Sequence, residues 1–167
     1  MKNLQNVEKK IDRVDGQLYE TFIIKDDKGN EVQRINYPLK VEIKIHDILE
    51  IIVGASILAV PVAFTEEVWN MGDELPWLNT LLLSGLSLLF LGSFTYYSSY
   101  RSKLRMYGKE YYKRVFFTFF FSLLVVGLLL TIVGKCPWFT DFDLALKRAI
   151  IGAFPASLSA TVTDSIG

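Results

Sequence analysis

The stretches LNTLLLSGLSLLFLGSFTYYSSY (residues 78–100) and VFFTFFFSLLVVGLLLTIVG (residues 115–134) contain no charged side chain. A helix needs about 20 apolar residues to cross the hydrocarbon core of a bilayer, which is about 30 Å thick, and both stretches reach that length. Both are also too long to be core helices of a 19.0 kDa globular domain. They therefore predict two transmembrane helices.

Two shorter apolar stretches, one on each side of this pair, predict two further spans. Their uncharged parts, residues 51–64 and 149–163, fall short of about 20 residues, so both spans carry acids at or near their ends. The expected fold is an all-α membrane domain over residues 46–167. Its four transmembrane helices are expected at residues 48–69, 78–100, 115–134 and 146–166.

Residues 1–45 are polar and mixed in charge, which predicts a small water-exposed appendage of α+β structure and no cleaved signal peptide. A short amphipathic helix over residues 1–16, stopped by Gly16, is predicted by four apolar residues at helical spacing: Leu4, Val7, Ile11 and Val14.

A β-hairpin is predicted after this helix. Residues 18–25 and 31–37 read as strands, and the turn-rich group DDKGN lies between them at residues 26–30. Pro38 ends the second strand. Residues 41–45 alternate apolar and charged side chains, which leaves open both a third strand and a stiff lead-in to the first span.

The composition excludes several classes of function. Eighteen basic and eighteen acidic residues give a net charge of zero, so no bulk positive field favours a nucleic-acid partner. Cys136 is the single cysteine, so it either packs in the protein, the favoured reading, or pairs between chains. The sequence has no zinc-protease HExxH motif, no nucleophile elbow, no phosphate-binding glycine loop and no CxxC motif, so we expect neither an enzyme nor a cofactor.

The distribution of basic residues predicts the orientation, because short loops rich in Lys and Arg stay in the cytoplasm. The loop after the second predicted span has six basic residues, whereas the loop after the first has four acids and no basic residue. With an even number of spans, both termini are predicted to be cytoplasmic in a multi-pass protein of the cell membrane. The six basic residues are Arg101, Lys103, Arg105, Lys109, Lys113 and Arg114.

The first predicted span carries a narrow polar stripe. On a helix, Glu50, Gly54, Pro61 and Thr65 fall within about 60° of one another. Pro61 frees a carbonyl one turn earlier, and in lipid that carbonyl needs a partner, so the stripe should face protein or water. The alternative is that Glu50 simply lies in the headgroup layer.

The fourth predicted span is rich in small residues, which let other helices approach closely and predict a central position in the bundle. Asp164 lies near its end and is a functional candidate, because acids within spans are rare and costly, although water reaches a chain end easily. The expected helix-packing residues of the two spans are Gly54, Gly152, Ala156, Ser159 and Thr163.

The first and fourth spans resemble each other. Aligning Gly54 with Gly152 also pairs Thr65 with Thr163, and the two spans run in opposite directions in the predicted topology. Paired, proline-containing helices of this kind occur in the inverted repeats of transporters. The match is short and consists largely of residues that are common in membranes.

A cation or proton site is a further hypothesis. On a helix, His46 and Glu50 share a face, Asp47 lies between them in sequence, and Asp164 lies on the same side of the membrane. The alternative, a solvated cluster at the interface, is favoured for these residues. On the opposite side, an acidic mouth that would concentrate cations is formed by Glu66, Glu67, Asp73 and Glu74.

The stretch AVPVAFTEEVWNMG, residues 59–72, resembles the signature of a bacterial and archaeal family of integral membrane proteins without an assigned function. In that signature a proline is followed by Thr-x-Glu-x-Trp, matched here by Pro61, Thr65, Glu67 and Trp69. Residues 152–156 resemble the family as well, whereas the N-terminal tail does not. The resemblance implies that these four residues matter as a group, and it implies no biochemical role.

The leading hypothesis is a small-cation channel or transporter that works as a homo-oligomer in the bilayer, because four spans scarcely enclose a pathway alone. The alternative is a non-transporting scaffold or sensor whose N-terminal region docks a cytoplasmic partner. A water-filled, acid-lined cavity between the first and fourth spans would favour transport, and a dry, packed seam would favour the alternative. The pathway or gating candidates are Glu50, Pro61, Thr65, Glu67 and Asp164.

Overall fold

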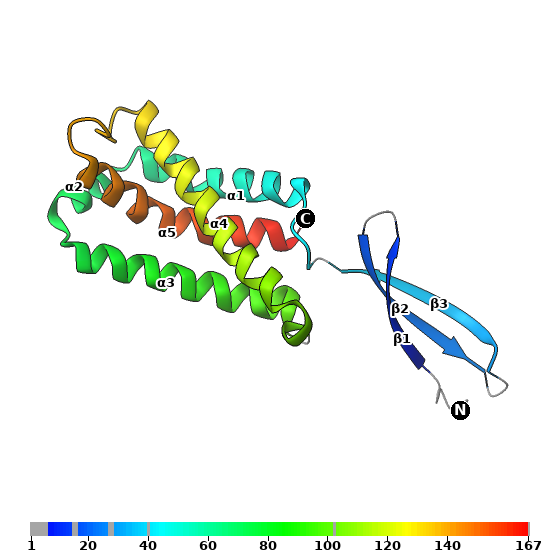
Figure 1. The fold of residues 1–167 in the computed structure, drawn as a ribbon. Coiled ribbons are helices and arrows are strands. Elements are labelled where there is room, and N and C mark those ends of the chain that lie inside the picture. The colour runs from blue at the N-terminus through cyan, green and yellow to red at the C-terminus, as the bar shows by residue number, and fades with distance from the viewer. Residues whose placement is uncertain (1–6, 15–16, 27–28, 40, 102, 167) are drawn as a thin grey trace. The chain divides into compact units, whose positions relative to one another are not determined.

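The computed structural model describes residues 7–14, 17–26, 29–39, 41–101 and 103–166 (Figure 1). The chain forms two compact units, Met1–Glu42 and Ile43–Gly167. The first contains a small antiparallel sheet, and the second contains a bundle of helices.

The sheet of the first unit has the strand order β1-β2-β3, with β1 at Val7–Val14, β2 at Gln17–Lys25 and β3 at Glu31–Pro38. The predicted hairpin is confirmed as β2 and β3, and Pro38 is the last residue of β3. In the turn, the Asp26 carboxylate accepts the Asn30 backbone N–H at 2.9 Å, and Gly29 has a φ of 83°, which is costly for residues with a Cβ.

The predicted N-terminal helix is wrong over residues 7–14, which form β1. Val7 and Ile11 are four positions apart, a spacing that puts two residues on one face of a helix and equally on one face of a strand. All eight residues of β1 pair with β2, from Val7 opposite Ile24 to Val14 opposite Gln17, which satisfies backbone groups along the whole segment. Leu4 and Gly16 lie outside the described residues.

The second unit consists of α1 (Ile45–Ala63), α2 (Glu66–Glu74), α3 (Trp77–Thr95), the π-helical turn η1 (Tyr96–Tyr100), α4 (Leu104–Ile132) and α5 (Phe142–Ile166). Within the part of the chain that the structure describes, four helices are long and apolar enough to cross a membrane: α1, α3 together with η1, α4 and α5. The predicted fold class, a helical membrane domain of four spans with a small N-terminal appendage, is confirmed, although the described part of the appendage is a sheet and not α+β structure. Of the two readings left open for residues 41–45, the lead-in to the first span agrees with the structure, since these residues form no strand and α1 begins at Ile45.

The first span is shorter than predicted. Helix α1 ends at Ala63 and Thr65 is extended, so Trp69 belongs to the separate helix α2. The hydroxyl of Thr65 donates to the Pro61 carbonyl at 2.8 Å, and the Trp69 indole N–H donates to the Ala63 carbonyl at 3.0 Å. Because α2 carries four acids, it is too polar to continue α1 through the hydrocarbon layer.

The third span begins earlier than predicted. Helix α4 has 29 residues, which is about 44 Å of helix and well above the roughly 30 Å of the hydrocarbon core. Its first eleven residues contain four of the six basic residues that were predicted to form a loop. Non-helical angles at Tyr107 mark a kink within this polar part of the helix.

Helix α5 is the centre of the bundle, as its small residues predict. It packs against α1, α2, α3 and α4, and Figure 1 shows it between α1 and α3 with α4 crossing both. Its buried face contains Ala149, Gly152, Ala153, Ala156 and Ala160. Large apolar side chains of the outer helices are exposed instead, such as Leu82 at 62% and Phe116 at 63%, as expected for surfaces in contact with lipid.

Candidate functional site

The seam between α1 and α5 is closely packed. A Cβ added to Gly54 would lie 2.6 Å from the Thr163 side chain and 2.9 Å from the Ala160 backbone. A Cβ added to Gly152 would lie 2.7 Å from Val126 and 3.3 Å from Val62. The two glycines therefore let α1, α4 and α5 approach within contact distance. At these glycines the helices are packed together, whereas the transport hypothesis expected an aqueous cavity between the first and fourth spans.

These contacts only partly follow the predicted inverted repeat. Gly54 of α1 contacts Thr163 of α5. If α1 and α5 were related by a two-fold axis, the equivalent contact would join Gly152 of α5 to Thr65. Instead, the nearest side chains to Gly152 are those of Val62 and Val126, because α1 ends at Ala63.

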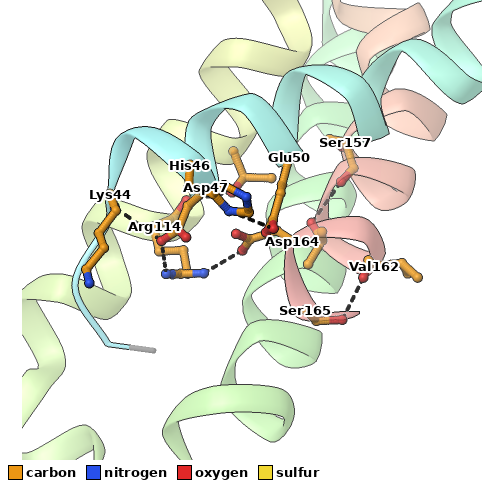
Figure 2. A network of polar contacts seen from close by, with 11 residues as sticks. Lys44, His46, Asp47, Glu50, Arg114, Ser157, Val162, Asp164 and Ser165 are labelled. Carbon is orange, nitrogen blue, oxygen red and sulfur yellow. Dashed lines mark hydrogen bonds and ion pairs between the residues drawn. The ribbon is translucent and has the colours of Figure 1, made fainter. Parts of the chain in front are cut away.

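An ionic cluster lies where the beginning of α1 meets the end of α5. The Arg114 guanidinium on α4 donates to the Asp164 carboxylate on α5 and to the Asp47 carboxylate on α1, both at 2.7 Å (Figure 2). The side chains of Arg114 and Asp164 are 3% and 6% exposed, and that of Asp47 is 14% exposed. One arginine thus joins three helices through buried charge-assisted hydrogen bonds.

The same Asp47 oxygen also caps α1. It accepts the backbone N–H of Lys44 at 3.2 Å, and Lys44 is the extended N-cap residue of the helix. An acid in the first turn is favourable beside the positive end of the helix dipole. Asp47 therefore connects the start of α1 to the buried Arg114.

Glu50 completes the cluster on α1. Its Oε1 atom pairs with Nδ1 of His46 at 2.9 Å, one helical turn earlier, and Figure 2 shows its carboxyl group pointing toward Asp164. Glu50 Oε2 and Asp164 Oδ1 are buried and have no hydrogen-bond partner among the residues that the structure describes. Three carboxylates and one guanidinium leave a formal charge of −2 on the cluster when His46 is neutral.

A second polar cluster holds the opposite end of α5. Arg148 donates to the Trp69 carbonyl at 3.0 Å, to the Lys135 carbonyl at 2.7 Å and to the Asp73 carboxylate at 2.8 Å. Arg148 and Asp164 are sixteen residues apart, or about 24 Å along the helix, so the two clusters lie near opposite edges of the hydrocarbon layer. The guanidinium of Arg148 ties α2 and the loop before α5 to α5.

Cys136 lies in that loop and packs against α5, with its thiol 3.5 Å from the Ala145 carbonyl. Burial raises the pKa of the Cys136 thiol to about 11, and the nearby Arg148 charge opposes this only in part. The thiol is therefore protonated at neutral pH, which fits the predicted packing role.

The structure separates the predicted site residues into two groups. Glu50 and Asp164 meet in the ionic cluster, together with the proposed metal ligand His46. Pro61, Thr65 and Glu67 lie toward the other end of α1 and on α2, where Pro61 and Glu67 are exposed. Of the predicted packing residues, Gly54, Gly152 and Ala156 are buried, whereas Ser159 and Thr163 are half-buried and bond within α5.

Arg114 is the residue that the sequence placed wrongly, in a cytoplasmic loop. It is buried on α4. Two features of the sequence could have indicated this position: Arg114 immediately precedes the uncharged stretch at residues 115–134, and three acids predicted on the same side of the membrane need a buried cation.

Four apolar helices, a lipid-facing apolar surface and charged clusters near both ends define a polytopic integral membrane protein. The chain belongs to the family described as "Putative integral membrane protein (DUF2391)", which it matches over residues 16–164. The match extends the resemblance seen in the sequence, because it includes the predicted hairpin as well as the spans. Neither a search of curated proteins nor a search of solved structures gave a match.

Proposed function

We propose that this protein is a membrane-embedded sensor that passes the state of the ionic cluster to its N-terminal sheet. The observation that carries the proposal is the double role of Asp47, whose Oδ2 atom accepts hydrogen bonds from both Arg114 and the Lys44 backbone. A change of charge in the buried cluster therefore acts on the first turn of α1.

The connection to the sheet is short. Strand β3 ends at Pro38 and α1 begins at Ile45, so the capped turn follows closely on the sheet along the chain. Loss of an N-cap interaction costs about 1 kcal/mol, enough to change how often the first turn opens. In this proposal the opening of that turn alters the N-terminal unit, which docks a cytoplasmic partner.

The packed seam supports a sensor more than a conduit. Gly54 and Gly152 bring α1, α4 and α5 into direct contact. A pathway for ions between these helices would require them to separate at these positions. Two pockets among the described residues lie on outward-facing surfaces of the helices and have almost wholly apolar walls. One is lined by α3, η1 and α5 and has a volume of about 380 Å³.

Hydrogen–deuterium exchange on the full chain in detergent tests this coupling. We expect Arg114→Gln to speed exchange of the amides at residues 44–50 by about tenfold, because Asp47 loses the group that holds it against the cap. Arg105→Gln, an exposed position on the same helix, is the matched control and should leave these amides unchanged. Equal exchange at residues 44–50 in Arg114→Gln and the parent chain would contradict the proposal.

The second candidate function is small-cation transport by a homo-oligomer, and the buried carboxylates favour it. Acids near the bilayer core commonly mark ion pathways. Cation flux into proteoliposomes distinguishes the sensor from the transporter. The flux is measured for the parent chain and for three variants: Glu50→Gln, Asp164→Asn and Glu67→Gln. Flux that falls in Glu50→Gln and Asp164→Asn would favour transport over the sensor, and flux equal to that of empty liposomes would exclude transport.

We also propose that both termini face the cytoplasm of a cell membrane. The basic residues Arg105, Lys109 and Lys113 are exposed on the first turns of α4, whereas the exposed acids Glu66 and Glu67 lie on α2, at the other end of the bundle. Reporter fusions at the two termini and in α2 should report cytoplasmic, cytoplasmic and external locations. The reverse pattern would overturn this topology.

A further inference from the structure

We propose that His46, Glu50 and Asp164 form a binding site for one divalent transition-metal cation at the mouth of the ionic cluster. The inference names the ligand of the proposed sensor and depends on that function only for its biological role. The binding itself depends on the geometry and charge of the cluster.

Two of the three proposed donors, His46 and Glu50, are already close together on α1. His46, Asp47 and Glu50 each offer a ligand atom, and these atoms lie within 4.8 Å of one another. His46 and Glu50 face each other across one helical turn, so the backbone of α1 fixes their spacing. The side chain of His46 is 75% exposed, which gives a cation from the aqueous side a path to the site.

Asp164 adds an independent indication of a ligand. Its side chain is 94% buried, given its 6% exposure, and its Oδ2 atom is held by Arg114. Its Oδ1 atom is buried without a hydrogen-bond partner among the described residues, and so is Oε2 of Glu50. Buried carboxylate oxygens without partners are costly, and coordination of a cation would satisfy both.

The charge of the cluster fits a divalent ion. Arg114 neutralises one of the three carboxylates, and the remaining formal charge of −2 is balanced by a single divalent cation. Because the two aspartates bond Arg114 through Oδ2, the guanidinium orients them and leaves Asp164 Oδ1 available. A histidine beside carboxylates is the donor set of ions such as Mn²⁺ or Zn²⁺ and is less suited to Mg²⁺ or Ca²⁺.

Binding of Mn²⁺ to the purified full chain in detergent, after treatment with a chelator, tests the site. Electron paramagnetic resonance measures the free Mn²⁺ during the titration, and Zn²⁺ is then added as a competitor. We expect one saturable site per chain that Zn²⁺ displaces. Glu50→Gln and His46→Ala should each weaken binding at least about tenfold, since loss even of an outer-shell partner has an effect of that size.

Two controls separate this site from general binding and from loss of fold. Glu67→Gln removes an exposed acid on α2, at the other end of the bundle, and should leave the affinity unchanged. Glu50→Gln keeps the size of a side chain whose Oε2 has no hydrogen-bond partner among the described residues, so circular dichroism and size-exclusion profiles should match the parent. Asp164→Asn is less informative, because it also disturbs the pair with Arg114.

Absence of saturable Mn²⁺ and Zn²⁺ binding would overturn the metal site, as would equal affinity in Glu50→Gln and the parent chain. The first result would mean that protons balance the charge, or that water donates hydrogen bonds to the carboxylate oxygens, in place of a metal ion. Neither result would remove the sensor proposal, which depends on the exchange of residues 44–50. A failed exchange test with intact metal binding would remove the sensor and leave the site.

Discussion

Single residues set the geometry of the bundle, and Gly54 shows this most directly. Two residues of the predicted polar stripe on α1, Glu50 and Gly54, both face α5. Glu50 places a carboxylate there, and Gly54 has no side chain to keep the two helices apart. Without a Cβ at Gly54, Thr163 and Ala160 of α5 approach the backbone of α1. The close packing of α1 against α5 at this point therefore depends on the absence of a side chain at Gly54.

We expect Gly54→Leu to destabilise the bundle by about 1–3 kcal/mol or to prevent its folding, because the new side chain would overlap α5. Thermal unfolding in detergent measures the change. Gly85→Leu on α3 is the matched control, since a Cβ at Gly85 meets no described atom within 4 Å. Equal melting temperatures for Gly54→Leu and Gly85→Leu would refute the packed seam.

Cys136 provides a second test at this scale. Its thiol pKa, raised from 9.0 to about 11 by burial, should slow maleimide labelling at pH 7.5 by roughly 100-fold relative to the unfolded chain. Because the folded pKa is the higher one, Cys136 leaves stability unchanged below pH 9 and lowers it as the pH rises from about 9 to 11. Rapid labelling of the folded protein would contradict the buried position.

At the scale of elements, apolar length and turn chemistry predicted most of the structure. The predicted span at residues 78–100 agrees with α3 and η1, and the predicted span at residues 146–166 agrees with α5. The predicted hairpin agrees with β2 and β3. Strand β1 was mistaken for a helix because its apolar spacing suits both structures, and only pairing with β2 decides between them. The ends of α1 and α4 depend on where the chain meets the headgroup layer, which residue spacing does not encode.

The turn of the hairpin gives a prediction for the sheet. Gly29→Val should destabilise the β2–β3 turn by about 1–2 kcal/mol, because the φ of 83° suits glycine and not a β-branched residue. Faster amide exchange in β2 and β3 of the full chain would report this loss. Gly29→Asn should have a smaller effect, since asparagine tolerates positive φ, and identical exchange in the two variants would argue against this turn geometry.

For the whole molecule, the sequence identified the acids and the histidine of the ionic cluster but not its arginine. Glu50 and Asp164 could be predicted as candidate site residues, because acids near the ends of short spans are costly and often have a functional role. Their joining by Arg114 could not be predicted, since an arginine beside a run of basic residues reads as a loop charge until the fold brings α1, α4 and α5 together. Thr65 was grouped with Glu50 by its spacing on one long helix, and the break after Ala63 separates the two. Glu67 was singled out by the family resemblance and lies on α2.

We expect Arg114 and Asp164 to act as one coupled buried unit that holds three helices together. A double-mutant cycle tests this coupling most directly, with unfolding free energies measured in mixed detergent for Arg114→Gln, Asp164→Asn and the double variant. We predict that each single change costs about 3–5 kcal/mol, because each removes one partner of a buried ion pair. The double variant should lose at least about 1 kcal/mol less than the sum of the two. Additive losses, or single losses below about 0.5 kcal/mol, would contradict the account.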